Sequence, residues 1–150
     1  MVDSRAKGSR GETLARDKLR ELTGLPWERV PGSGALDPKH KLKGDLYIPD
    51  SNNNYCVEVK NYAEDHFTSK ILTDKTPQFS IWWEQTTREA KQVNKKPCLI
   101  FKFDRSKFFV AFEEDYNNIP LNYRWVYYSA DNCFIMRLED WIKVLEPVWV

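Results

Sequence analysis

The chain has 150 residues, of which 41% are hydrophobic, 14% aromatic and 30% charged, with a formal net charge of +1. This length suits one domain with one core, and the apolar content excludes an intrinsically disordered chain. The longest apolar runs are far too short to cross a bilayer, so a membrane partner is not expected.

The charge is unevenly distributed along the chain. Residues 1–44 carry ten Lys or Arg against six Asp or Glu, whereas residues 45–150 carry thirteen against sixteen. A basic leading segment favours a polyanionic partner, and ordinary solvated surface charge explains the counts equally well.

The N-terminus and the cysteines indicate the cellular compartment. The first residues, MVDSRAKGSRGE, contain no apolar stretch of the kind that a secretory signal requires. Cys56, Cys98 and Cys133 are odd in number, widely spaced and without a CxxC pair, so neither a disulfide framework nor a zinc site is indicated. We therefore expect a protein of a reducing, cytoplasmic compartment.

In chain order, the first predicted element is a helix over residues 9–23. Ser9 and Glu12 have the spacing of a capping box at its start, and Gly24 follows its end. Apolar residues form a stripe along it: Ala15, Leu19 and Leu22. Glu12 lies on the same stripe, so it is either only the capping partner of Ser9 or an acidic group directed towards the sheet.

Strand-like runs then alternate with turn signals. WERV is a short strand that Pro31 and GSG end, and residues 35–44 read as a loop. DLYI and YCVEVK are strands separated by PDSNNN. Residues 61–77 show no clear period and are predicted to form a loop.

The second half of the chain adds a helix, four strands and a closing helix. Apolar residues at helical spacing predict a helix over residues 78–93, CLIFKF, FFVAF, RWVYY and CFIMR predict strands, and LEDWIKVL predicts a helix. The order of elements predicts one α/β or α+β domain over residues 1–150, with a central mixed β-sheet flanked by helices.

The charged residues inside the two central strands need an explanation, because burying an uncompensated charge is costly. Side chains alternate across a strand, so Glu58 and Lys60 share one face. If PDSNNN closes a simple hairpin, Asp45 lies opposite Glu58, with Cβ atoms about 4.5–5.5 Å apart. Two carboxylates at that distance repel unless one is protonated or a cation lies between them.

This arrangement predicts metal-dependent phosphodiester hydrolysis. Mg²⁺ commonly uses one or two carboxylates together with substrate phosphate. Lys60, on the same face, is placed to hold or help deprotonate an attacking water and to offset phosphate charge. The alternative is a cross-strand salt bridge on a solvated sheet face.

These residues resemble the archaeal-type Holliday-junction resolvases, within the wider PD-(D/E)XK nuclease superfamily that includes many restriction endonucleases. The resemblance runs from about Lys7 to Phe103, over KGSRGE, RVPGSGA, GDLYI, CVEVKNY, and WWEQTTREA before KPCLIFKF. The acid–x–lysine motif is shared by the whole superfamily, whereas KGSRGE together with GSG points to resolvases. The resemblance implies a restriction-endonuclease-like core.

The resemblance also implies roles for individual residues. Asp45 and Glu58 are expected to be metal ligands together with Glu12 and Val59, and Lys60 is expected to be the catalytic lysine. Ser33 matches a serine of the GSG loop near the active site, with turn chemistry as its alternative. Gln85 matches a helix glutamine that many members carry beside the site, with a solvent-facing position as its alternative.

Cofactor and partners follow from the same resemblance. Mg²⁺ is the expected cofactor, with Mn²⁺ as a substitute. The expected substrate is branched DNA with a four-way junction, cut by a homodimer whose two-fold symmetry supplies two matched sites. We expect the encoding genome to be prokaryotic or viral. DNA contacts are predicted for these residues: Arg5, Lys7, Arg10, Ser33, Lys39, Lys41 and Lys43.

The sequence departs from the family pattern in two places. Residues 62–77 form a longer segment than expected, and the aromatic tail from Asn117 has no counterpart that we can place. The tail favours a core role over a base-stacking platform, and His40 and His66 read as surface residues. Two rival functions remain: another nuclease of the superfamily, such as a restriction or repair nickase, and a non-catalytic nucleic-acid-binding domain.

Overall fold

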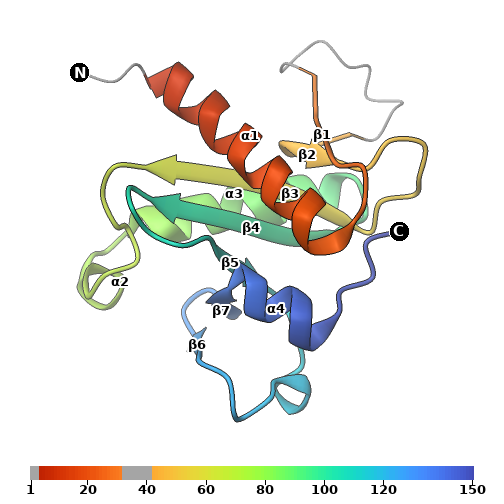
Figure 1. Ribbon diagram of the computed structural model, residues 1–150. Helices are drawn as coiled ribbons and strands as arrows, with labels where there is room; N and C mark the ends of the chain where they lie inside the picture. The colour runs from red at the N-terminus through yellow and green to blue at the C-terminus, as the bar shows by residue number, and fades with distance from the viewer. Residues whose placement is uncertain (1–3, 32–41) are drawn as a thin grey trace.

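The computed structural model describes residues 4–31 and 42–150, and side chains from Lys7 onwards. A seven-stranded sheet in the order β1-β2-β3-β4-β5-β7-β6 forms its centre (Figure 1). The strands are β1 (Glu28–Arg29), β2 (Leu46–Tyr47), β3 (Tyr55–Tyr62), β4 (Lys96–Phe103), β5 (Phe109–Phe112), β6 (Trp125–Tyr128) and β7 (Cys133–Arg137). The helical segments are α1 (Ser4–Thr23), α2 (Lys70–Thr73), α3 (Gln78–Gln92), the 3-10 turn η2 (Tyr116–Asn118) and α4 (Leu138–Leu145).

The sheet is mixed. Strands β3 and β4 pair in parallel, with Glu58 opposite Leu99, while the other described pairs are antiparallel. Parallel neighbours need a crossover, and α3 supplies it. The mixed sheet with flanking helices confirms the predicted fold class.

Two hydrophobic clusters hold the helices against opposite faces of the sheet. Helices α1 and α4 pack on one face through Ala15, Leu19 and Trp141, all buried. Helix α3 covers the other face through Phe79, Trp82 and Trp83. Figure 1 shows α1 crossing in front of β3 while α3 lies behind β3 and β4. Strand β3 is therefore enclosed between α1 and α3.

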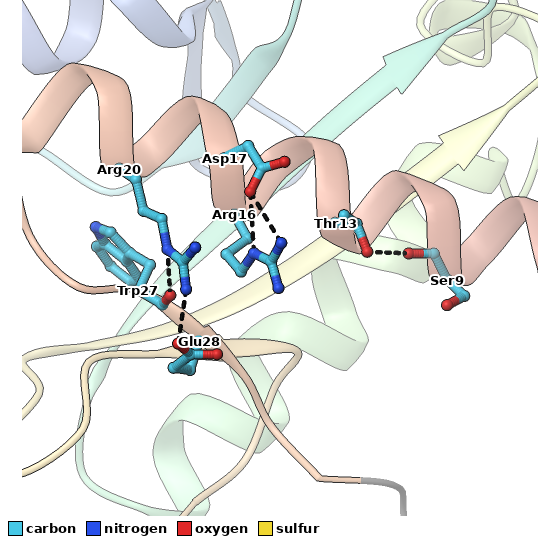
Figure 2. Close-up of polar contacts among 7 residues, drawn as sticks. All are labelled: Ser9, Thr13, Arg16, Asp17, Arg20, Trp27 and Glu28. Carbon is cyan, nitrogen blue, oxygen red and sulfur yellow. Dashed lines mark hydrogen bonds and ion pairs between the residues drawn. The ribbon is translucent and has the colours of Figure 1, made fainter.

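Helix α1 begins earlier than predicted, at Ser4 instead of Ser9. Ser9 lies inside the helix, where its carbonyl accepts a hydrogen bond of 3.1 Å from Thr13 Oγ1 (Figure 2). The predicted capping box of Ser9 and Glu12 is therefore wrong, because the preceding Arg, Ala and Lys residues favour helix and extend it. The predicted end is confirmed: Gly24 has φ of +72° and its amide donates to the Arg20 carbonyl at 2.9 Å.

Polar contacts fix the connection from α1 into β1. Arg20 donates to the Trp27 carbonyl at 2.8 Å and pairs with Glu28 at 2.6 Å, as Figure 2 shows. Trp27 is almost fully buried and packs edge-on against Trp149, with ring centroids 4.9 Å apart. The start of β1 is therefore attached to α1 through Arg20 and to the C-terminal segment through Trp149.

The two departures from the family pattern have structural explanations. The predicted loop over residues 61–77 is wrong in part. Strand β3 continues through Tyr62, and α2 forms one helical turn within the segment. Trp141 and Trp149 of the aromatic tail are buried, so the predicted core role is confirmed for them. In the part of the chain that the structure describes, no helix is both long and apolar enough for a membrane span.

Candidate active site

The β2–β3 hairpin places Asp45 against Glu58. Leu46 pairs with Val57, which confirms the predicted register. By that register Asp45 falls next to Glu58, and the two carboxyls interact. The Asp45 amide donates to the Val57 carbonyl at 2.7 Å, and Asp45 Oδ2 accepts from the Val59 amide at 2.7 Å. The carboxylate of Asp45 is thus held over β3 by backbone groups.

Glu58 is a buried carboxylate among other acids, with 4% of its surface exposed. Burial raises its pKa well above the ordinary range, and the nearby carboxyls of Glu89 and Asp45 raise it further. Burial also raises the pKa of Asp45, as does the charge of Glu12, while its hydrogen bond from Val59 acts in the opposite direction. Such a cluster is relieved by protons or by a cation.

Glu12 enters this region from α1. Its Oε2 accepts from Arg29 Nε at 3.1 Å and from an Arg29 terminal nitrogen at 2.7 Å. It also lies within hydrogen-bonding reach of Asp45. The side chain of Glu12 is 25% exposed, so it links the helix to the hairpin and still reaches solvent.

Lys60 and Gln85 contact each other. Lys60 Nζ donates to Gln85 Oε1 at 3.1 Å, and both side chains are partly buried. Lys60 follows Glu58 on the face of β3 that meets α3, while Val57 and Val59 pack on the opposite side in the cluster that holds α1. Gln85 therefore lies beside Lys60, and its role in catalysis stays a prediction.

A cleft of about 290 Å³ collects these groups. Its lining comes from α1, the β2–β3 hairpin and α3: Lys7, Gly8, Glu12, Asp45, Glu58, Val59, Lys60, Asn61, Tyr62 and Gln85. At its rim Tyr62 is 39% exposed and stacks on Trp82, with ring centroids 5.0 Å apart.

The predicted DNA-contacting residues are only partly described. Ser33, Lys39 and Lys41 lie outside the described residues, and Arg5 is described by its backbone alone. Lys7 lines the cleft, where it pairs with Asp104. Arg10 and Lys43 are exposed.

Sequence reasoning missed Glu89. Its carboxyl lies within hydrogen-bonding reach of Glu58, and its Oε2 is buried without a hydrogen-bond partner in the structure. Gln85 and Glu89 are four residues apart on α3 and therefore share a helix face. The spacing from Gln85 is therefore the signal in the sequence that indicates Glu89.

The donor set fits a hard divalent cation. Asp45 and Glu58 supply neighbouring carboxylate oxygens as ligands. Because the carboxyls are buried and repel each other when both are charged, a cation between them is favourable. Within residues 4–31 and 42–150, no three acid, histidine or cysteine side chains are arranged to hold a metal ion by themselves. The cation site therefore rests on the Asp45–Glu58 pair, and direct ligation by Glu12 or Val59 stays a prediction.

Comparisons with known proteins found similar proteins at the level of family, sequence and solved structure. A family model described as "Phage putative PDDEXK endonuclease" matches residues 3–150. Protein D14 of Escherichia phage T5 is 50% identical over 115 residues, which cover 75% of this chain and 72% of that protein. Among solved structures, Hjc of Archaeoglobus fulgidus, a Holliday junction resolvase, matches with a TM-score of 0.43 and 16% identity over 87% of this chain and 88% of that chain.

Proposed function

Because the chain belongs to the phage PDDEXK endonuclease family, as the resemblance of its sequence predicted, we propose that it is a Mg²⁺-dependent endonuclease that nicks branched DNA at the Asp45–Glu58–Lys60 site. The observation that carries this proposal is the opposition of two carboxylates with a lysine on the same face of β3. A solvated cross-strand salt bridge would not bury Glu58 to 4% exposure.

Each residue of the proposed site has a distinct role. Asp45 and Glu58 would hold the cation, which, when bound, activates water and stabilises charge on the phosphate. Lys60 positions a water or offsets phosphate charge, and Gln85 orients its ammonium group through the 3.1 Å hydrogen bond. Val59 keeps Asp45 in place through its backbone amide.

The proposed substrate is a four-way junction. The support is the sequence resemblance of KGSRGE and GSG to resolvases. A junction has near two-fold symmetry, and its resolution needs two matched nicks, which a symmetric homodimer supplies. A single-site nickase that acts on plain duplex is the rival within the same superfamily.

A cleavage assay tests the proposal. End-labelled junction, duplex and single strand are each incubated with Mg²⁺, Mn²⁺ or EDTA, and we expect paired nicks in the junction only with metal. Asp45→Asn, Glu58→Gln and Lys60→Ala should each lower the cleavage rate at least about 100-fold, as expected for loss of a charge-stabilising or proton-transfer group.

Two controls separate the rivals. Glu64→Gln and Lys70→Ala make the same kinds of change at exposed positions and should leave cleavage intact. Equal cleavage of duplex and junction would assign the protein to the nickase class. Binding without metal-dependent turnover would leave a non-catalytic DNA-binding domain.

A further inference from the structure

Six cationic side chains lie on one surface beside the cleft, and we call them the basic track. They come from α1, the end of β4, the β4–β5 connection and the end of β7: Lys7, Arg10, Lys18, Lys102, Lys107 and Arg137. Of these six residues, only Lys7 and Arg10 were predicted from the sequence to contact DNA.

Two acids place these cations near one another. Lys7 pairs with Asp104, and hydrogen bonding from Lys7 lowers the pKa of Asp104, with the charges of Lys102 and Arg10 acting in the same direction. Glu139 pairs with Lys18 at 2.8 Å and with Arg137 at 3.4 Å. Glu21 also lies 3.7 Å from Lys18. Six cations against these three acids still leave an excess of positive charge on this surface.

The track contains a pocket of phosphate-accommodating size. It has a volume of about 170 Å³ and is lined by Lys18, Lys102, Ser106, Lys107, Phe108, Arg137 and Glu139. Lys102 Nζ donates to the Phe103 carbonyl at 3.2 Å and lies 6.0 Å from the centre of the Phe108 ring. The protein thus holds one ammonium group in place while four cationic side chains line the pocket.

The basic track is continuous with the cleft. Lys7 lines the cleft and pairs with Asp104, whose amide donates to the carbonyl of Tyr62, another cleft residue, at 3.0 Å. Residues 7 and 18 are eleven apart, close to three helical turns, so they lie on the same side of α1 about 16 Å apart. That length corresponds to about five base pairs of duplex at 3.4 Å each.

We propose that the basic track binds the backbone phosphates of one duplex arm of the substrate and leads that arm to the cleft. The proposal rests on the proposed nuclease function for the identity of the polyanion. Phosphate contacts of this kind position DNA without reading its sequence, which suits an enzyme that recognises branching.

The test is the salt dependence of binding by Lys102→Ala/Lys107→Ala. Anisotropy of a labelled four-way junction and of a linear duplex is measured in EDTA over a range of salt concentrations. Each lost phosphate contact should flatten the slope of log K against log salt by about 0.9, so the double variant should lose up to about 1.8. Lys102→Arg/Lys107→Arg should restore the slope, because the charges remain.

The matched control is Lys91→Ala/Lys96→Ala, which removes two exposed cations from the end of α3 and the opposite end of β4. Its slope should equal that of the wild type. An unchanged slope in the Lys102/Lys107 variant, or an equal loss in the control, would overturn the basic track. Cleavage by the wild type is scored separately: absence of metal-dependent cleavage refutes the nuclease proposal whatever the slopes show, and active cleavage with an unchanged slope refutes the track alone.

Discussion

The carboxylates of the cleft cost the metal-free protein stability. Glu58 is buried between Asp45 and Glu89, and the pKa values of Glu58 and Asp45 are raised by burial and by neighbouring acids. The folded protein therefore retains protons that the unfolded chain releases just above pH 4. Stability falls as pH rises from there through the raised pKa values, because the folded state binds more protons than the unfolded state.

Removing the charge of Glu58 should stabilise the metal-free protein. In EDTA at pH 8, Glu58→Gln should melt higher than the wild type by at least about 2–4 °C, which corresponds to about 1 kcal/mol for a chain of this size. The difference should vanish near pH 4, where the unfolded glutamate is protonated as well. Differential scanning fluorimetry across pH measures both values.

Mg²⁺ and a second variant complete this test. Mg²⁺ should raise the melting temperature of the wild type at pH 8 more than that of Glu58→Gln, since the cation relieves the same repulsion. Glu64→Gln, at an exposed position, should change neither value. A lower melting temperature for Glu58→Gln at pH 8 would contradict the view that this carboxylate is destabilising.

Glu12 is not part of a capping box, so the alternative to a role at the cation site is its ion pair with Arg29. Glu12→Gln keeps the shape of the side chain and removes the charge near Asp45. We expect cleavage at limiting Mg²⁺ to fall at least ten-fold, which corresponds to about 1.4 kcal/mol of barrier, and to recover in part when Mg²⁺ is raised.

Arg29→Gln is the matched comparison for Glu12. It removes the ion pair of 2.7 Å and leaves the Glu12 carboxylate in place. If Glu12 serves the cation site, Arg29→Gln should lose less activity than Glu12→Gln. Equal losses would show that Glu12 acts through Arg29 alone.

At the scale of the elements, the predictable parts were those with strong local patterns. The strand runs, the helix over 78–93 and the register that pairs Asp45 with Glu58 all follow from alternation, helical spacing and the length of PDSNNN. The same patterns brought the central residues of the site together, since alternation alone puts Glu58 and Lys60 on one face.

The remaining parts depend on tertiary contacts that local patterns do not carry. Ser9 has the spacing of a cap, yet the helix continues past it to Ser4. The end of β3 at Tyr62 is stabilised by parallel pairing with Phe103, forty-one residues later in the chain. Glu89 has the sequence appearance of a surface residue and contacts Glu58 only because α3 packs across β3.

The hairpin depends on Gly44, which gives a prediction for β2 and β3. Its φ is +86°, and a Cβ there would lie 2.6 Å from the Val57 carbonyl oxygen. That oxygen also accepts the amide of Asp45, so relief of the clash must disturb the ladder. Gly44→Ala should lose stability, by about 1–3 kcal/mol for strain of this kind, together with most cleavage.

Gly24→Ala is its matched control. Gly24 has a similar φ of +72° with nothing within 4 Å of the added Cβ, and it lies at the end of α1 away from the cleft. The Gly24→Ala protein should be less stable than the wild type. At low temperature, where it remains folded, it should cleave at the wild-type rate. Cleavage by folded Gly44→Ala at the wild-type rate would show that the hairpin register does not control the site.

Across the molecule, the residues of the candidate site and the elements that complete the sheet and core come from different parts of the chain. The cleft draws on α1, β2, β3 and α3, all before residue 93. The later strands and α4 complete the sheet and the cluster of Trp27, Tyr55, Trp141 and Trp149. The basic track is the place where the later half would also meet the substrate.

The contact between α1 and β3 has a consequence for protein engineering. A Cβ on Gly11 would lie 2.4 Å from Asn61 Cβ, so a larger residue at this position requires a shift of α1 or Asn61. The α1 wall of the cleft is therefore held in place by this close contact. Helix α3 instead contributes side chains, with Gln85 in the cleft lining and Glu89 near Glu58. Redesign of metal preference or substrate scope should therefore start from α3, where residues can be changed without moving the frame that holds Asp45 and Glu58.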